Sequence, residues 1–372
     1  MSDRLRRPAA DLLDGWPTLG SIAEAVRKAG AEVTVVLSSH RDAVCEREGV
    51  TYRFVAERWS GGSAVTAYAI PRLAHLVRAL RPDVVHMNGF GFPFHTRALC
   101  AQGAPVLVQH HADNPDGRMR ALKRWGLAKI SAAAFTSSEQ AQAFFARAYF
   151  RQSLPVFEIP ESSTLFHDGD IADARRATGV FGDPAVLWVG HLNANKDPLT
   201  VLDGFARALR HLPNAHLWCC YRDAQLLGPI EARLGRDPML AGHVHLQGPV
   251  EHPKVEQFCR AADFFVLGSR QEGCAYVVLE AIACGATPIV TDIPAFRALT
   301  GRGKVGILCE TGNAEAFSAA LESLSNMPKK SLRARAIKHF QEELSFPVLG
   351  SKLVAAYEAI IARHTTVSIE PR

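Results

Sequence analysis

Two glutamates, Glu272 and Glu280, stand eight positions apart in the second half of the chain. They follow an apolar strand pattern, Phe264–Leu267, and flank a loop and the expected start of a helix. If that helix begins near Ala275, the backbone N–H groups of Gly273–Tyr276 point outward at its N-terminus, where they suit a diphosphate. Glu280 then lies about one turn further along the same face. Two surface glutamates beside an ordinary loop have the same spacing, so spacing alone leaves both interpretations open.

A second polar segment follows the expected strand Val186–Val189 and contains Gly190, His191 and Lys196. A glycine at a strand end lets the backbone approach a ligand closely. A lysine and the N-terminus of the amphipathic helix that follows supply positive charge for a phosphate or a diphosphate. An ordinary strand-to-helix loop has a similar composition, so this segment does not identify a site by itself.

The elements that position these residues alternate between short apolar strand patterns and helical patterns, which indicates β–α–β units and parallel sheets. The strands expected in the first half are Val33–Leu37, Asp83–His86, Pro105–Gln109, Ala133–Thr136 and Pro155–Ile159. The helices expected among them are Ser21–Ala29, Tyr68–Leu80 and Glu139–Tyr149. Gly30 is the expected C-cap of the first helix, Pro82 stops the second, and Ser137 with Ser138 caps the third.

A second series begins after a polar stretch around residues 161–184. Its expected strands are Val186–Val189, His216–Cys220, Val244–Leu246, Phe264–Leu267, Thr287–Val290 and Gly306–Leu308. We place the domain boundary between residues 164 and 165, which gives domains of residues 1–164 and 165–348. A last helical pattern, Leu349–Ala362, follows the break at Phe346-Pro347. Because parallel sheets bind ligands at the carboxyl ends of their strands, the motifs are expected to gather there.

Composition excludes several classes of protein. The 372 residues are 48% hydrophobic and 21% charged, as in an ordinary globular chain, and a net charge of +5 is too small to imply nucleic-acid binding. The eight cysteines form no C-x-x-C pair, which is typical of buried thiols in a reducing compartment. The arginines near the N-terminus are not followed by an apolar signal core, and no run of eighteen uncharged apolar residues occurs. We therefore expect a soluble, cytoplasmic protein.

Over about residues 185–325 the chain resembles the retaining nucleotide-sugar glycosyltransferases of GT-B fold, family four. Four motifs occur in the family's order: Gly190 to Pro198, the Glu272 and Glu280 pair, Glu280-Ala281 with Cys284-Gly285, and Thr287 to Asp292. The resemblance implies an α/β architecture of two Rossmann-like domains with parallel sheets facing a central cleft. It also implies that the C-terminal helix, residues 349–372, crosses back onto the first domain.

The resemblance further implies a role for each site residue. Lys196 would contact the donor diphosphate, Glu280 the donor ribose, and Glu272 the transferred sugar, where it helps to stabilise the developing oxocarbenium charge. Transfer would be a front-face displacement with retention, in which the leaving diphosphate accepts the proton of the acceptor. No metal and no cofactor would be required. The full set of expected donor-binding residues is Gly190, His191, Lys196, Gly273, Cys274, Ala275, Tyr276 and Glu280.

The first domain would hold the acceptor. Family members often place a supporting histidine at the end of a strand, and His110 or His111 is expected to serve, although a strand-end histidine is more commonly a structural hydrogen-bond donor. The chain departs from the family pattern at several points. His191 stands where many members have arginine, Ala275 replaces a common glycine, and Glu161 begins a segment that replaces Asn-Gly-Val-Asp. The first strand and the Gly-Gly loop near the start of the family's chains also lack a counterpart.

Three questions stay open at the level of sequence. The acceptor can be a glycan, a lipid or a small molecule. The basic stretch from Arg118 to Lys129 can face an anionic acceptor, a membrane surface or only solvent, so peripheral membrane contact is one possibility. The chain can also be a non-catalytic module that binds a nucleotide sugar or a glycan, or another GT-B enzyme such as an epimerase or a phosphorylase. The presence of Lys196, Glu272 and Glu280 favours transfer.

Overall fold

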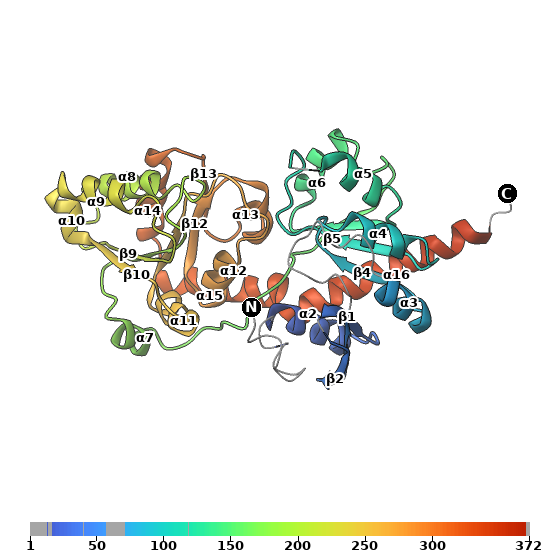
Figure 1. Cartoon of the computed structure of the whole chain (residues 1–372). Coiled ribbons are helices and arrows are strands. Elements are labelled where there is room, and N and C mark those ends of the chain that lie inside the picture. The colour runs from blue at the N-terminus through green and yellow to red at the C-terminus, as the bar shows by residue number, and fades with distance from the viewer. Residues whose placement is uncertain (1–12, 14–16, 40, 57–70, 118, 370–372) are drawn as a thin grey trace. The chain divides into compact units, whose positions relative to one another are not determined.

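The computed structural model describes residues 13, 17–39, 41–56, 71–117 and 119–369. The chain divides into two compact units, of which unit 1 comprises Met1–Ser163 with Phe346–Arg372 and unit 2 comprises Thr164–Ser345. This division lies one residue before the boundary expected from the sequence. The last helix, α16 (Phe346–Ile369), belongs to unit 1 although it follows unit 2 in the chain (Figure 1).

Unit 1 starts with α2 (Pro17–Lys28) and a three-stranded sheet in the order β1–β3–β2. β1 (Thr34–Ser39) is parallel to β3 (Val50–Ala56), but β2 (Ala43–Arg47) is antiparallel to β3. The expectation of purely parallel pairing is therefore wrong at β2. The Glu48-Gly49 turn explains the difference, because both residues have positive φ, 50° and 75°, and close a two-residue hairpin.

The second sheet of unit 1 has four parallel strands in chain order. They are β4 (Val85–Asn88), β5 (Val106–Gln109), β6 (Ala132–Phe135) and β7 (Val156–Glu158). Each overlaps an expected strand. The accompanying helices are α3 (Pro71–Leu80), α4 (Pro93–Cys100), α5 (Arg120–Leu127) and α6 (Ser138–Ala146). Ser137 caps α6 in a capping box with Gln140, as a serine before a helix predicts, whereas residues 68–70 of the expected α3 lie outside the described residues.

The apolar stripe of α16 is buried within unit 1. Leu349, Leu353 and Ala356 share a cluster with Val26 of α2, and Ile360 packs against the β5–β6 part of the second sheet. Within the described part of the chain, one stretch, Lys329–Thr366, is long and apolar enough to cross a membrane by length and composition. Its first part, α15 (Lys329–His339) and the π-helical turn that follows, belongs to unit 2, and only its last part, α16, packs its apolar stripe inside unit 1.

Unit 2 is built on one sheet of six parallel strands in the order β10–β9–β8–β11–β12–β13. The strands are β8 (Ala185–Gly190), β9 (His216–Tyr221), β10 (Val244–Gly248), β11 (Phe264–Leu267), β12 (Thr287–Thr291) and β13 (Ile307–Cys309). Its helices are α7 (Ile171–Thr178), α8 (Pro198–Ala208), α9 (Leu227–Gly235), α10 (Pro238–His243), α11 (His252–Ala261), α12 (Tyr276–Ala283), α13 (Pro294–Leu299), α14 (Ala314–Ser325), α15 (Lys329–His339) and the π-helical turn η2 (Phe340–Leu344). This strand order places β8 and β11 side by side, so the loops that follow them meet at one edge of the sheet.

Candidate functional site

The loops after β8 and β11 bring Lys196 and Glu272 into contact. Lys196 Nζ lies 2.5 Å from Glu272 Oε1, and the two side chains are only 15% and 11% exposed. Two further hydrogen bonds join the same loops, from Arg270 N to Asn195 O at 2.8 Å and from Asn195 Nδ2 to Gln271 O at 2.9 Å. The two motifs that the sequence places 76 residues apart therefore form one polar site.

Asp197 links the two loops of this site through hydrogen bonds. Its Oδ1 accepts from the Thr200 hydroxyl at 2.9 Å at the start of α8, and its Oδ2 accepts from Arg270 Nη2 at 2.7 Å. Gly268 makes the close approach possible, because a Cβ there would lie 2.9 Å from the carbonyl oxygen of Asp197. Asp197 thus joins the end of β11 to the N-terminus of α8, a role that the sequence alone left unassigned.

The segment Gly273–Tyr276 leads into α12, as the glutamate spacing predicts. Ala275 is the N-cap residue, with a φ of 59° and no side-chain capping hydrogen bond, and Tyr276 begins the helix. Cys274 is buried. The left-handed conformation of Ala275 favours glycine, the residue that the resemblance leads one to expect at this position.

Glu280 lies on α12 and is almost fully buried, at 8% exposure. Its Oε1 is 2.6 Å from Nε2 of His252, the first residue of α11, and the His252 ring packs against Phe166 with a centroid separation of 4.7 Å. Burial raises the pKa of Glu280 above its ordinary 4.5, and the hydrogen bond from His252 opposes that rise. Sequence reasoning missed His252, because a single histidine after a strand carries no spacing signal.

The other expected donor-side residues lie at the end of β8. Gly190 is the last residue of the strand, and a Cβ there would come within 3.2 Å of the Trp188 ring. His191 follows it and is exposed. The Lys196 side chain comes within 3.8 Å of the position that a Cβ of Gly190 would occupy.

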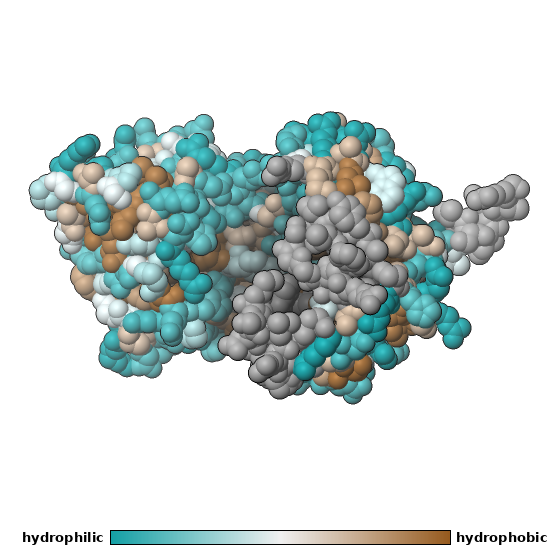
Figure 2. Space-filling model, in the orientation of Figure 1, coloured by the Kyte–Doolittle hydropathy of each residue, from teal (hydrophilic) through white to brown (hydrophobic). Residues whose placement is uncertain are grey.

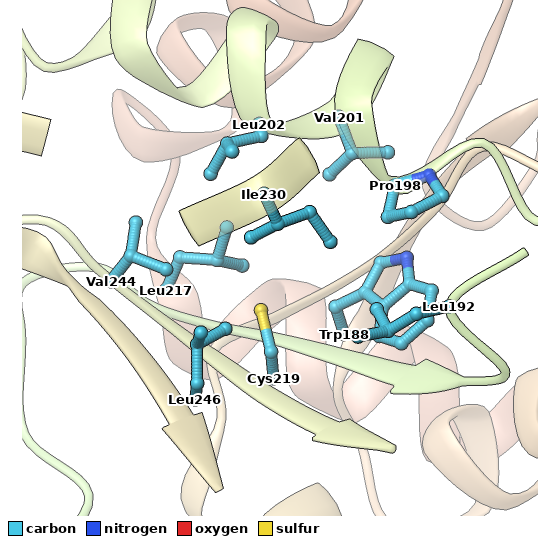
Figure 3. Close-up of a pocket in the computed structure, with 10 residues that line it drawn as sticks. All are labelled: Trp188, Leu192, Pro198, Val201, Leu202, Leu217, Cys219, Ile230, Val244 and Leu246. Carbon is cyan, nitrogen blue, oxygen red and sulfur yellow. The ribbon is translucent and has the colours of Figure 1, made fainter. Parts of the chain in front are cut away.

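An apolar cavity lies beside this site without being part of it (Figure 3). Its volume is about 10 Å³, and ten residues of β8, β9, β10, α8, α9 and the loops beside them line it. None of the lining residues is Lys196, Glu272 or Glu280. A space of that size holds one water molecule at most, and its walls offer almost no polar partner. The cavity is a packing defect beneath α8.

The two histidines of unit 1 have different surroundings. His110 is buried, stacks on Phe135 with ring centroids 4.7 Å apart, and also contacts Phe90 and Phe144. Its Nε2 lies 3.1 Å from the carbonyl oxygen of Asp113, to which it donates. Burial lowers the pKa of His110, which favours the neutral ring. These contacts give His110 a packing role in the core of unit 1.

His111 instead faces the surface at the carboxyl edge of the second sheet. Its side chain is 35% exposed, and its Nδ1 lies 2.7 Å from Glu161 Oε2. Its Nε2 lies 3.1 Å from Oδ1 of Asn88, the last residue of β4. Neither Glu161 nor Asn88 was expected in a site, although the replacement of the family's Asn-Gly-Val-Asp turn marks Glu161 as unusual.

No group of three or more His, Cys, Asp or Glu side chains among the described residues is arranged to hold a metal ion. The cysteines are all free thiols, and six of them are buried. Burial raises the pKa of Cys220 and of Cys309 to about 12, so these thiols are protonated and unreactive at neutral pH.

Comparisons with known proteins agree with this architecture. The family model for glycosyl transferases group 1 matches residues 183–327, and the model for glycosyltransferase family 4 matches residues 18–153. A D-inositol 3-phosphate glycosyltransferase from Thermobispora bispora is 27% identical over 220 residues, which are 55% of this chain and 50% of that protein. A GDP-mannose:cellobiosyl-diphosphopolyprenol alpha-mannosyltransferase from Xanthomonas campestris is 27% identical over 269 residues, 68% of this chain and 67% of that protein. The chain thus matches about half the length of the first of these relatives.

Solved structures share the fold over nearly the whole chain. Sucrose-phosphate synthase from Thermosynechococcus elongatus has a TM-score of 0.68 at 18% identity and covers 93% of both chains. HepE from Anabaena, in complex with UDP and glucose, has a TM-score of 0.66 at 16% identity and covers 92% of this chain and 95% of its own. These neighbours confirm the expected GT-B class of two Rossmann-like α/β domains. The chain therefore carries a glycosyltransferase family 4 domain over residues 18–153 and a glycosyl transferases group 1 domain over residues 183–327, within a fold that these neighbours share.

Proposed function

We propose that this chain transfers a hexosyl group, with retention, from a nucleotide diphosphate sugar to an acceptor. The observation that carries the proposal is the contact between Lys196 and Glu272 at the edge of the unit 2 sheet, beside the start of α12. The cation and the helix N-terminus at this edge of the sheet suit the diphosphate of a nucleotide sugar, and the carboxylate suits the hydroxyls of the sugar. The two matched family domains support this chemistry.

Lys196 and the first turn of α12 would hold the diphosphate. Without a ligand, the charge of Lys196 is balanced by Glu272 at 2.5 Å. A diphosphate offers Lys196 a stronger anionic partner, so donor binding would release the Glu272 carboxylate toward the sugar ring. There Glu272 can accept hydrogen bonds from sugar hydroxyls and stabilise the positive charge that develops at the anomeric carbon.

Glu280 would bind the ribose of the donor. One oxygen, Oε1, is held by His252 at 2.6 Å, which orients the carboxylate and leaves Oε2 for the ribose hydroxyls. Glu280 lies on the buried helix α12, and its partner His252 is the first residue of α11. Two helices therefore hold the carboxylate in place. His252 is thus proposed as a positioning residue of the donor site.

For the reaction itself we propose front-face displacement. The bond between the anomeric carbon and the diphosphate oxygen breaks, the acceptor oxygen attacks the same face, and the leaving diphosphate takes the acceptor proton. In this chain Lys196 and the α12 N-terminus would neutralise the leaving group, and no metal or cofactor is invoked. His111, rather than the buried His110, is the proposed supporting histidine of unit 1.

The acceptor is proposed to be a glycan, a lipid or a small molecule that binds on unit 1. The X. campestris relative is named for a lipid-linked acceptor, cellobiosyl-diphosphopolyprenol. The T. bispora relative is named for D-inositol 3-phosphate. Both names describe anionic acceptors, which the basic residues of unit 1 would suit.

A surface patch on α4 and α5 supports contact with a membrane. Phe92 and Trp125 are exposed, at 39% and 44%, and the Trp125 ring packs edge-on against Phe94 with centroids 5.5 Å apart. The guanidinium of Arg97 lies over the Trp125 ring at 5.3 Å. Arg120, at the start of α5, is also exposed. Figure 2 shows hydrophobic surface next to hydrophilic surface in this part of unit 1.

Exposed aromatic rings beside arginines fit the boundary of an anionic lipid bilayer, where rings enter the interface and cations meet the headgroups. We propose that the α4–α5 patch, defined as Phe92, Phe94, Arg97, Arg120 and Trp125, makes peripheral membrane contact. The chain would then work in the cytoplasm, at the membrane surface. Lys123 contributes less, because it lies 3.6 Å from Asp113 and is mostly buried.

The test is donor turnover. The purified chain is incubated with UDP-glucose, GDP-mannose and ADP-glucose, released nucleotide is measured, and the anomer of the sugar product is read by proton NMR. Transfer to water or to an added acceptor with the α-anomer as first product supports retention, whereas the β-anomer contradicts it. Nucleotide binding without any release would support the alternative, a non-catalytic nucleotide-sugar-binding module.

A further inference from the structure

Unit 2 begins with a segment that lies against α11. The segment starts at Thr164, and its third residue, Phe166, is 7% exposed. The Phe166 backbone N–H donates to the Thr164 hydroxyl at 3.0 Å, and the Phe166 ring packs on the His252 ring with centroids 4.7 Å apart and planes inclined by 35°. His252 is the first residue of α11. Phe166 thus contacts α11 at the residue whose Nε2 lies 2.6 Å from the Glu280 carboxylate.

Hydrogen bonds to α11 hold the rest of this segment. His167 N donates to Glu256 Oε1 at 3.1 Å, and the carbonyl oxygen of His167 accepts from Arg260 Nε at 2.9 Å. Glu256 and Arg260 also pair with each other, with Oε1 of the first 2.5 Å from Nη2 of the second. They lie about one and two turns after His252 on the same helix. The residue that follows Phe166 is therefore fixed to the helix that carries the ring partner of Phe166.

The His252 side chain is 66% exposed, although its hydrogen-bond partner Glu280 is almost fully buried. A side chain with so much exposed surface has several accessible rotamers unless contacts select one. Here the Phe166 ring and Oε1 of Glu280 both contact the imidazole and favour one orientation. Aromatic rings in tilted contact attract each other beyond the effect of the area that they bury. Loss of the Phe166 ring would therefore release His252 into other rotamers and weaken its hydrogen bond to Glu280.

The surroundings of Glu280 make this hydrogen bond important for its ionisation. Burial raises the pKa of Glu280, the nearby charge of Glu256 adds to the rise, and the hydrogen bond from His252 opposes it. The hydrogen bond with Cys284 raises the pKa of Cys259 well above its ordinary value, so this thiol on α11 is neutral near pH 7. Among the described residues, His252 is thus the group that favours the ionised carboxylate of Glu280.

We propose that Phe166 is a positioning residue of the donor site, which acts by holding the His252 ring against Glu280. The first segment of unit 2 then helps to orient the carboxylate that would bind the ribose. The ligand class affected is a nucleoside diphosphate and its sugar conjugates, since the ribose is the part of the donor that Glu280 would contact. This inference rests on the proposed function, because Glu280 matters for transfer only if it binds the donor.

Two substitutions of Phe166 separate the ring contact from simple packing. Phe166→Leu keeps most of the apolar volume in the core of unit 2 but removes the aromatic face, whereas Phe166→Tyr keeps the ring. Phe340→Leu is the matched control, because Phe340 is 9% exposed, belongs to the same hydrophobic core and lies on η2. The thermal midpoint of each variant monitors its folding.

The first readout needs no nucleotide. The pKa of Glu280 is measured by carbon NMR of the full chain labelled at its glutamate carboxyl groups, with the Glu280 signal identified by its absence in Glu280→Gln. In Phe166→Leu this pKa is expected to rise above the wild-type value, in the same direction as in His252→Ala, because the opposing hydrogen bond is weakened. Phe166→Tyr and Phe340→Leu should match the wild type. A Glu280 pKa in Phe166→Leu that equals the wild-type value or lies below it would overturn the positioning role.

The second readout is the affinity for UDP, GDP and ADP, measured by calorimetric titration at several pH values. At pH 7 Phe166→Leu should bind the preferred nucleotide about twofold to tenfold more weakly than the wild type, as loss of one aromatic contact predicts. Its affinity should also begin to fall at a higher pH as the solution is acidified, and Phe166→Tyr should restore both properties. A purely structural role would lower the thermal midpoint without moving that pH. Equal affinity and equal pH dependence in Phe166→Leu and the wild type contradict the inference.

The two proposals fail in distinguishable ways. If the wild type binds none of the three nucleotides, the proposed donor site is wrong, and the hold of Phe166 on His252 is judged by the Glu280 titration alone. If nucleotide binds but Glu280→Gln binds it as tightly as the wild type, Glu280 is not a donor ligand, and the role of Phe166 in the donor site is wrong as well. If binding depends on Glu280 but not on the Phe166 ring, only the positioning role is overturned.

Discussion

Lys196 Nζ and Glu272 Oε1 lie 2.5 Å apart although the residues belong to different strand-to-helix loops. Without a ligand, the ammonium group of Lys196 and the carboxylate of Glu272 neutralise each other, and both side chains are largely buried. A diphosphate sugar would separate them, with the phosphate drawing Lys196 and the sugar hydroxyls drawing Glu272. This exchange of partners would be the central step of donor binding.

Substitutions at the pair should therefore have different effects. Lys196→Ala should weaken donor binding about tenfold to a hundredfold, the usual cost of losing a hydrogen bond to a charged group. Glu272→Ala should retain nucleotide affinity within a small factor but reduce kcat about a hundredfold or more, because it stabilises charge only as the sugar bond breaks. Calorimetric titration with UDP or GDP and steady-state nucleotide release measure the two effects. Equal losses of affinity in both variants would contradict the division of roles.

Donor affinity should depend on the protonation of Glu280. Burial raises its pKa above 4.5, so the carboxylate gains a proton at a less acidic pH than an ordinary glutamate and then accepts fewer ribose hydrogen bonds. Affinity for UDP-glucose or GDP-mannose should be complete above that raised pKa and fall as the pH decreases through it. Removing the opposing hydrogen bond in His252→Ala should move the fall to higher pH. The control is Glu280→Gln, whose weak affinity should no longer vary over this range.

The same raised pKa affects stability with the opposite sign. A carboxyl group whose pKa is higher in the folded state than in the unfolded state stabilises the fold when protonated, and this contribution is lost as pH rises through the folded pKa. Relative to wild type, Glu280→Gln should therefore gain stability as pH rises from 4.5 toward neutrality. Urea denaturation at several pH values measures this difference. A difference that stays constant with pH would show that Glu280 titrates as it does in the unfolded chain.

Ala275 provides a test of local strain at the start of α12. Its φ of 59° is unfavourable for a residue with a Cβ, so Ala275→Gly should stabilise unit 2 by about 1 kcal/mol. Ala283→Gly, at the end of the same helix, is the control and should destabilise by about 1 kcal/mol or more. Denaturant titration distinguishes the two. Loss of stability in Ala275→Gly would mean that Ala275 makes contacts that outweigh its backbone strain.

The two adjacent histidines of unit 1 should separate by phenotype. His110→Ala removes a ring packed among Phe90, Phe135 and Phe144 and should cost about 2–4 kcal/mol of stability. His111→Ala should change stability much less, because its side chain is 35% exposed, but should lower turnover. Thermal midpoints and nucleotide release are measured on the same preparations. A more severe loss of stability in His111→Ala than in His110→Ala would reverse the assignment.

Membrane contact through the α4–α5 patch can be measured by vesicle flotation. The chain should bind phosphatidylcholine vesicles that contain phosphatidylglycerol and release them at high salt. Arg120→Gln should weaken binding about fivefold, corresponding to about 1 kcal/mol per cation at an anionic surface. Trp125→Gln should weaken it through lost insertion, whereas Met239→Gln, an exposed apolar residue of unit 2, should have no effect. Failure to bind anionic vesicles at low salt would contradict the proposed membrane contact of the α4–α5 patch.

Much of the fold can be predicted from local patterns. The alternation of strand and helix patterns, the Ser137 cap and the strand before Glu272 all depend on neighbouring residues, and the structure confirms them. The β2–β3 hairpin is not among the predicted elements, although its Glu48-Gly49 turn is a local signal, because alternating strand and helix patterns predict β–α–β units alone.

The site is less predictable, because its contacts join residues that are distant in the sequence. The resemblance pointed to Lys196, Glu272 and Glu280, but no spacing rule brings His252 to Glu280 or Glu161 to His111. The sequence also treats His110 and His111 alike, since both follow β5. Only the packing of Phe90 and its neighbours distinguishes the buried ring from the exposed one.

The most direct test of the donor site is a thermal-shift panel of UDP, GDP and ADP with their common sugar conjugates. It compares the wild type with Lys196→Ala and with Lys330→Ala, an exposed lysine on α15 that serves as the control. We predict that one nucleotide family stabilises the wild type and the control, by about 2.7 kcal/mol at a hundredfold excess over Kd, and that Lys196→Ala loses the effect. Equal stabilisation of all three proteins, or of none, would contradict the claim that Lys196 and Glu272 form the donor site.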